Sequence, residues 1–156
     1  MPKASKQTAS EHETLEGYEG HFEHFEDGWT VGFESYTQDA DLSPLFKGLP
    51  DDECQCEHMG YVIKGKVAFR SGDTEEVFVG GDAYYVGPGH TPVLYAGTEV
   101  VEFSPTEKLG RTMEVVTRNM ERCSPHPPEG AGARDWGRSG RQSLPRARMS
   151  GLRFAR

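Results

Sequence analysis

The most constraining feature of this sequence is a series of short apolar runs separated by turn residues. The runs are rich in Val, Tyr, Phe or Ile, and each is bounded by Gly, Asp or Pro. They occupy residues 57–64, 66–70, 75–79, 83–86, 92–96 and 99–103. Short runs of this kind with turn signals between them are typical of the strands of a β-sandwich or barrel. The 19 glycines suit such tight turns better than they suit a helical bundle.

The strand pattern begins earlier, with a hairpin expected around a Glu-Asp-Gly turn at residues 26–28. After the turn, apolar and polar residues alternate, as they do in a half-buried strand. The alternating residues are Trp29, Val31 and Phe33 with Thr30, Gly32 and Glu34. Residues 37–50 follow as a loop, and its apolar residues Leu42, Leu45 and Phe46 are expected to cover one end of the core.

One helix is expected directly after the last run. Ser104 is a favourable N-cap, Pro105 suits the first helical position, and Glu107 completes a capping box with Ser104. Apolar residues then recur at helical spacing, at Leu109, Met113, Val116 and Met120. We expect this helix to pack on the outside of the barrel.

The two ends of the chain lack such patterns. Residues 1–16 are polar and are expected to form a disordered lead-in, so the folded domain is assigned to residues 17–121. Residues 122–156 hold eight Arg, no Lys and two acidic residues, a net charge of +6, and are expected to form a flexible basic tail. The first 121 residues hold nine basic and 23 acidic residues, a net charge of −14. An acidic body argues against a nucleic-acid groove and suits a small molecule or a cation.

Cysteine usage and hydropathy indicate the compartment. The sequence has an odd number of cysteines, Cys54, Cys56 and Cys123. Two cysteines that lie two residues apart on a strand do not readily form a disulfide. A reducing compartment is therefore expected. The N-terminus lacks the apolar segment of a secretory signal, and no apolar run approaches the length of a membrane span. We expect a cytoplasmic protein with a small-molecule ligand and without membrane or nucleic-acid partners. A homodimer is the one oligomeric state that we retain as an alternative to a monomer.

Cysteine and histidine gather at the two ends of the stretch 51–92. Cys54, Cys56 and His58 alternate with other residues, so on an extended strand all three point to one face. Thiolate and imidazole are good ligands for transition metals such as Zn²⁺, Fe²⁺ or Cu and poor ones for Mg²⁺ or Ca²⁺. One strand seldom supplies a whole site, and His90 is the candidate for the missing ligand. The alternative for the cysteines is a buried, apolar role.

This stretch resembles the two-motif core of the cupin superfamily, whose fold is a double-stranded β-helix, or jelly-roll barrel. The first cupin motif runs His, one residue, His, three or four residues, Glu, six residues, Gly. Gly65 stands at the final glycine, and His58 stands at the place of the Glu. Cys54 then takes the second His position and Asp52 the first. In a second register, Cys54 and Cys56 replace the two histidines, which keeps Cys56 as a candidate.

The second cupin motif runs Gly, five residues, Pro, one residue, Gly, two residues, His, three residues, Asn. Gly81 and Gly89 match it, whereas Gly87 stands at the Pro position and Pro92 at the His position. The usual histidine of this motif is therefore absent. His90 lies two residues earlier, and on a strand residues two apart share a face.

The resemblance spans about residues 17–120 and is closer still to small single-domain cupins with Cys and His in the first motif. It implies an all-β cupin barrel with one C-terminal α-helix, and a small-molecule-binding protein with a divalent transition metal such as Zn or Fe. The implied ligands are Cys54, His58 and His90, with Asp52 or Cys56 as the fourth. Four tyrosines are candidates for substrate contact: Tyr61, Tyr84, Tyr85 and Tyr95. An enzyme of this kind would carry out metal-assisted chemistry on a small organic acid, thiol or sugar derivative.

Whether the chain is an enzyme stays open at this point. Replacement of the usual ligands also fits a metal-free ligand-binding or regulatory cupin without catalysis. A third hypothesis gives the main role to the basic tail, because its arginines suit phosphate contacts with nucleic acid or contacts with an acidic partner. Metal analysis of protein purified without chelator separates the first two hypotheses.

Overall fold

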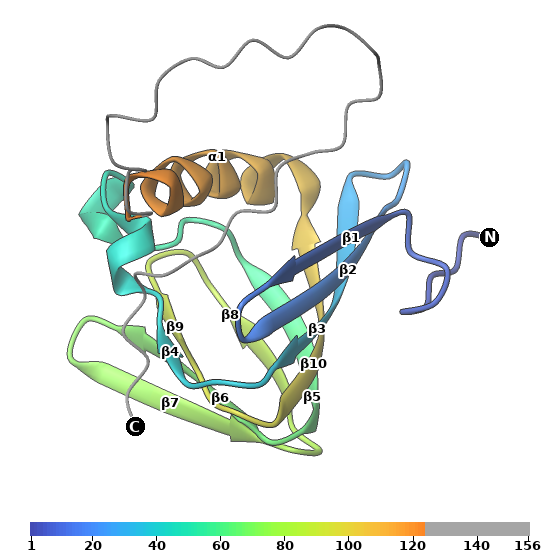
Figure 1. Ribbon diagram of the computed structural model, residues 1–156, viewed down its shortest axis with the longest axis horizontal. Coiled ribbons are helices and arrows are strands. Elements are labelled where there is room, and N and C mark those ends of the chain that lie inside the picture. Colours follow the sequence, from blue (N-terminus) through green and yellow to red (C-terminus); the bar gives the residue numbers. More distant parts are fainter. Residues whose placement is uncertain (124–156) are drawn as a thin grey trace, which may run out of the picture.

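The structure, a computed structural model, describes residues 1–123 as two facing antiparallel β-sheets with a helix across one end (Figure 1). The larger sheet has the order β1-β2-β3-β10-β5-β8, and the smaller has the order β4-β9-β6-β7. The strands are β1 (Glu11–Leu15), β2 (Tyr18–His24), β3 (Trp29–Tyr36), β4 (Ala40–Asp41), β5 (His58–Lys64), β6 (Lys66–Ser71), β7 (Thr74–Val79), β8 (Ala83–Val86), β9 (Thr91–Leu94) and β10 (Thr98–Pro105). The helices are η1 (Ser43–Phe46), η2 (Pro50–Asp52) and α1 (Thr106–Cys123).

Strands β3 to β10 are connected in the order of a jelly roll. The chain crosses from one sheet to the other at every connection in this series except the one between β6 and β7. Eight strands in two sheets with this order form the jelly-roll architecture, which cupins share. The expected all-β jelly-roll fold with one C-terminal helix is therefore confirmed.

The predicted runs correspond to β5 to β10, and their ends differ from the observed strand ends by at most two residues. The turn between β5 and β6 shows why glycine marks these ends so well. Gly65 has a φ of +76°, and a Cβ at this position would lie 2.7 Å from the Cα of Thr98. Only glycine accepts both the backbone conformation and the close approach of the neighbouring chain.

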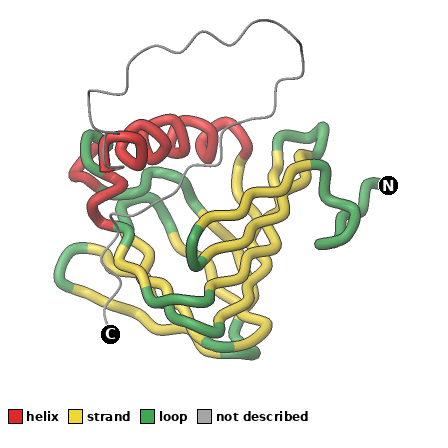
Figure 2. The backbone as a smooth tube through the Cα atoms, viewed as in Figure 1, coloured by secondary structure: helices red, strands yellow, loops and turns green. Residues whose placement is uncertain are grey.

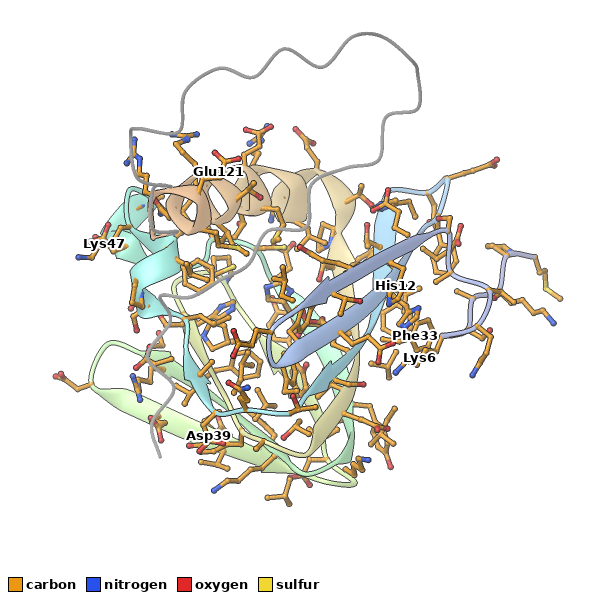
Figure 3. All side chains as sticks on the ribbon, in the orientation of Figure 1. Lys6, His12, Phe33, Asp39, Lys47 and Glu121 are labelled. Atoms are coloured by element: carbon orange, nitrogen blue, oxygen red, sulfur yellow. The ribbon has the colours of Figure 1, made fainter. Side chains whose placement is uncertain are left out.

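The larger sheet carries polar residues and glycine beside the apolar residues of its inner face, such as Val62 and Val100. One row of paired residues across the sheet faces inward, and it consists of Gly32, Glu102, Gly60 and Tyr84. The adjacent row faces outward and is apolar, with Phe33, Val101 and Tyr61 side by side. Figure 3 shows Phe33 on the outer side of the barrel, near His12 and Lys6. The inner wall of this sheet is therefore built for a cavity and not for a fully apolar core.

The first residues of the chain differ from the prediction of a disordered lead-in. Strand β1 pairs antiparallel with β2 from Glu11 opposite Phe22 to Leu15 opposite Tyr18. This strand is polar, and backbone pairing holds it rather than an apolar face. The predicted basic tail lies outside the described residues, except for its first two residues, which end α1.

Helix α1 begins at Thr106, one residue after the predicted start at Pro105, because β10 continues to Pro105 and the hydroxyl of Ser104 lies against His58. The helix crosses the open end of the barrel rather than its outer wall (Figure 2). Val116 packs there with Leu45 of η1, and Nδ2 of Asn119 donates to the Leu45 carbonyl at 2.8 Å. The loop expected to cover one end of the core thus meets the helix. No helix in the described part of the chain has the length and apolar character needed to cross a membrane.

Candidate metal centre and cavity

Two segments that are distant in the sequence meet at the helix end of the barrel and bring Cys54, His58 and His90 together. An isolated β-bridge joins Cys54 to His90, and the Cys54 N–H donates to the His90 carbonyl at 2.8 Å. Gly89 has a φ of +84°, a conformation that favours glycine, and its N–H donates to the Cys54 carbonyl at 2.7 Å. His58 is the first residue of β5. One ligand atom from each of the three side chains lies within 4.8 Å of the other two.

Hydrogen bonds at Nδ1 hold both imidazole rings. Nδ1 of His90 lies 2.6 Å from the carbonyl oxygen of Gly87, which can only accept, so this nitrogen carries a proton. Nδ1 of His58 lies 3.0 Å from Oε1 of Glu102 and 2.7 Å from Oγ of Ser104, and the carboxylate requires a proton on this nitrogen too. Nε2 is thus the nitrogen that each ring presents to the cluster, and that of His58 lies 3.5 Å from the sulfur of Cys54.

Nε2 of His90 is the single buried side-chain nitrogen or oxygen without a hydrogen bond within residues 1–123. The residue is 1% exposed, so water does not reach it freely. Leaving such an atom unsatisfied costs about 1–3 kcal/mol. With the proton on Nδ1, Nε2 presents a lone pair to Cys54 and His58. A buried lone pair beside a thiol and a second imidazole fits a transition metal such as Zn²⁺.

Charges inside the cluster favour ionisation of the thiol. Burial opposes ionisation of Cys54, but the hydrogen bond with His58 and the nearby imidazole of His90 outweigh it and lower its pKa to about 6. Burial also disfavours the charged form of His58, but Glu102 outweighs it and raises the pKa of His58 to about 10. Without a metal, Cys54 and His58 therefore form a thiolate–imidazolium pair at neutral pH. Metal binding has to displace a proton from His58.

The two candidates for a fourth ligand lie elsewhere. The sulfur of Cys56 points to the carbonyl oxygen of Glu57 at 3.3 Å, in the apolar cluster under α1, and burial raises its pKa to about 12. Asp52 is exposed, and its carboxylate accepts the N–H of Gly48 at 2.8 Å. The group at the helix end of the barrel therefore consists of three residues and excludes Cys56 and Asp52.

The four tyrosines predicted for substrate contact separate into one inside the barrel and three outside the cavity. Tyr84 lines the cavity and is 6% exposed. Tyr61 and Tyr85 are 45% and 66% exposed on the outer face of the larger sheet. Tyr95 lies under the ammonium group of Lys66, which is 4.1 Å from the ring centroid.

A predominantly apolar cavity of about 220 Å³ extends from the cluster into the barrel. Both sheets line it, and α1 closes one end with residues that include Thr112 and Val116. Glycine on the inner face makes room for the rings that line it. A Cβ at Gly60 would lie 2.7 Å from Cε1 of Tyr84, and a Cβ at Gly20 would lie 2.8 Å from Cζ of Tyr18. These two rings lie close against the sheet and leave the space above them open.

Two carboxyl groups inside the cavity were not predicted from the sequence. Glu102 accepts the hydroxyl of Tyr84 at 2.7 Å and faces His58 with its other oxygen. Glu34 accepts the hydroxyl of Tyr36 at 2.7 Å. Burial, together with the charge of Glu102, raises the pKa of Glu34 to about 7. The cavity thus has the Cys/His cluster at one end and a carboxyl–phenol network along one wall.

A second group with metal-ligand chemistry lies on the outside of the barrel. His12 and His21 are opposite each other on β1 and β2, with their rings stacked at 4.2 Å. Their Nε2 atoms lie 3.5 Å and 3.0 Å from the same oxygen of Glu19. Lys6 already pairs with this carboxylate at 3.0 Å. Any measurement of bound metal has to separate this surface group from the buried cluster.

Comparisons with known proteins give matches among solved structures, whereas no family model and no curated protein matches. An RmlC-like cupin from Shewanella frigidimarina has a TM-score of 0.47 at 16% identity, covering 65% of this chain and 88% of that chain. The EutQ protein of Clostridium difficile has a TM-score of 0.47 at 10% identity, covering 63% and 69%. The nucleoside dehydratase Pac13 of Streptomyces has a TM-score of 0.47 at 15% identity, covering 68% and 82%.

Likeness at these identities and TM-scores carries no function to this chain, and the fold is argued from the strand order instead. The order of β3 to β10 independently defines a jelly roll. By its strand order, the chain has a jelly-roll fold, the architecture that cupins have in common with other proteins.

Proposed function

We propose that this chain is a small-molecule-binding cupin that holds a divalent transition metal, such as Zn²⁺ or Fe²⁺, on Cys54, His58 and His90. The observation that carries the proposal is the buried lone pair on Nε2 of His90, which has no hydrogen bond within the described residues. Three protein ligands leave a coordination position open, as in catalytic zinc sites rather than structural ones. The cavity supplies space for a ligand beside that position.

The residues around the cluster suit reaction chemistry as well as binding. The bound metal would supply a Lewis acid to an oxygen or nitrogen atom of the ligand. Glu102 orients His58 through Nδ1, which keeps Nε2 directed inward. The apolar lining limits water and so strengthens electrostatic interactions. Tyr84 and Glu34 are among the lining groups that can give or take a proton.

A metal-free ligand-binding cupin without catalysis is the second candidate, and one observation favours it. Cys54 and His58 already satisfy each other as a charged pair at 3.5 Å, so two of the three cluster residues have a partner without a metal. The cavity then serves binding alone. In this arrangement Nε2 of His90 keeps its unsatisfied lone pair, which is why the metal-binding function is preferred.

Metal analysis and cobalt substitution distinguish the two candidates. Protein purified without chelator and without a histidine tag should contain one equivalent of metal in the buried cluster. After exchange for Co²⁺, a thiolate-to-cobalt absorption band should appear and should be lost in Cys54→Ser. His58→Ala and His90→Ala should each weaken binding at least as much as the roughly 10–100-fold typical of changes in orienting residues. The double variant should lose little more, because ligands of one site are not additive.

Matched controls locate the metal. Cys56→Ser replaces a buried thiol that lies outside the cluster, so the cobalt band should stay. The double variant His12→Ala/His21→Ala removes the surface group and should leave the buried equivalent in place. A protein that binds no metal is a metal-free cupin. Metal binding that His90→Ala leaves unchanged would place the metal outside this cluster.

A further inference from the structure

The charged residues that line the cavity favour one sign of ligand. Four glutamates line it: Glu13 and Glu16 at the β1 side, and Glu34 and Glu102 on β3 and β10. The described lining residues include no Lys and no Arg. The basic side chains that line it are His58 and His90, and His58 is paired with Glu102.

Of the two glutamates on β3 and β10, Glu34 is the one without a cationic partner. Within the described residues it forms no salt bridge, and its hydrogen bonds come from the neutral phenols of Tyr36 and Tyr18. Glu102, in contrast, faces the imidazole of His58 at 3.0 Å. A divalent metal with the thiolate of Cys54 and the carboxylate of Glu102 would be formally neutral. The metal therefore supplies no counter-charge to the ionised form of Glu34.

Aromatic rings surround this carboxyl group. The rings of Tyr18 and Tyr36 stack at a centroid distance of 5.5 Å, and both residues line the cavity. Phe22 lies beside them: a Cβ at Gly32 would be 2.9 Å from Cε1 of Phe22 and 3.1 Å from Oε1 of Glu34. Aromatic faces together with a carboxylate are the groups that recognise organic ammonium ions in proteins.

We propose that the ligand of this cavity is a small organic cation, an amine or quaternary ammonium compound, whose charged group lies against Glu34 between Tyr18, Tyr36 and Phe22. The proposal rests on the proposed function in that the cavity is the ligand site, and it is independent of the metal. The carboxylate of Glu34 then gains a counter-charge in a place where water is scarce. A carboxylate or phosphate ligand would meet like charges, which disfavours the organic acid implied by the family resemblance.

The volume limits the size of such a cation. About 220 Å³ corresponds to roughly seven water molecules. It is smaller than the roughly 300–1,000 Å³ of sites for drug-sized ligands. Choline, with a compact trimethylammonium group and one hydroxyl group, is a suitable probe. Its neutral isostere is 3,3-dimethylbutan-1-ol, and a comparable anion is 3,3-dimethylbutanoate.

Isothermal titration calorimetry of the full-length protein with these three probes tests the proposal. Choline should bind roughly tenfold or more tightly than the neutral alcohol, and the anion should bind most weakly. Glu34→Gln, which is isosteric and neutral, should remove the advantage of choline and leave the affinity for the alcohol in place. Glu34→Asp should retain the advantage. Glu114→Gln, an exposed change on α1, should have no effect.

Several results would overturn the proposal. These are equal affinities for choline and the alcohol, tighter binding of the anion, binding of none of the three probes, or an advantage of choline that persists in Glu34→Gln. The same titrations with His90→Ala separate this proposal from the metal site. A choline preference that survives loss of the metal supports the cation site even if the metal proposal fails.

Discussion

Replacing Gly60 by alanine tests the packing that keeps the cavity open. The added Cβ would lie 2.7 Å from Cε1 of Tyr84 and closer still to Cζ and Oη of the same ring. The ring has little room to retreat, because Phe69 and Phe78 pack against it at centroid distances of 5.1 and 5.4 Å. Tyr84 must therefore rotate or shift, and its hydrogen bond to Glu102 at 2.7 Å is lost.

The expected cost follows from these contacts. Overpacking a core costs about 1–3 kcal/mol. A hydrogen bond to a charged group contributes about 1.5–3 kcal/mol, and Glu102 loses that donor when Tyr84 moves. Replacing glycine within a strand returns about 0.5–1 kcal/mol through lower backbone entropy. We expect Gly60→Ala to lower the free energy of unfolding by about 2–5 kcal/mol.

Urea denaturation followed by circular dichroism measures this loss. Gly110→Ala in α1 is the matched control, because a Cβ there meets nothing within 4 Å, and it should stabilise the protein by about 0.5–1 kcal/mol. On a Tyr84→Leu background, Gly60→Ala should cost less than about 0.5 kcal/mol, since the clashing ring is gone. An unchanged stability of Gly60→Ala, or an equal loss on both backgrounds, would show that Tyr84 does not lie against Gly60.

Three further predictions concern a carboxyl group, a helix contact and the first strand. Burial raises the pKa of Glu34 from 4.5 to about 7, so the free energy of unfolding of the wild type falls as pH rises through this window. In urea unfolding, the stability of Glu34→Gln relative to the wild type should rise over the same window by up to about 3 kcal/mol. A stability difference that does not change with pH would contradict this. Asn119→Ala removes hydrogen bonds to the Leu45 and Lys47 carbonyls and should cost about 1–3 kcal/mol in the same assay; no loss would exclude those bonds. Deleting residues 1–16 removes β1 and a wall of the cavity, so calorimetry should show weaker choline binding, while unfolding should stay cooperative. An unchanged affinity for choline would place the binding site elsewhere.

The strands could be predicted from the sequence because the residues that end them are chemically distinctive. Runs of Val, Tyr, Phe and Ile stop at glycine, and a position such as Gly65 admits no other residue. Strand β1 could not be found in this way. Its sequence, Glu-His-Glu-Thr-Leu, has little apolar content, and its pairing partner β2 was visible only as half of another hairpin.

The candidate site was predictable in part. Cys54, His58 and His90 stood out by residue type, and the structure brings them within 4.8 Å, while their binding of a metal stays a prediction. Cys56 was included because alternation on a strand would give it the same face. Strand β5 begins only at His58, so the alternation does not extend back to Cys56.

Glu34 and Glu102 carried no signal of their own. Each stands next to apolar residues in an alternating strand, where a charged residue ordinarily faces water. The inner wall of this sheet faces a cavity instead, so the polar side of the alternation points inward. This reversal depends on how the two sheets and α1 enclose space, which is a property of the whole fold and not of either strand.

The junction between β10 and α1 determines how a ligand can reach the site. The strand ends at Pro105 and the helix starts at Thr106, without an intervening loop, and Glu102 and Ser104 lie in the last residues of that strand. Any swing of the helix would therefore pull on the residues that orient His58. We expect the ligand to enter and leave through the side of the barrel, beside Leu15 at the β1–β2 turn. Association and dissociation rates should then follow the motions of that hairpin, while α1 remains a fixed wall.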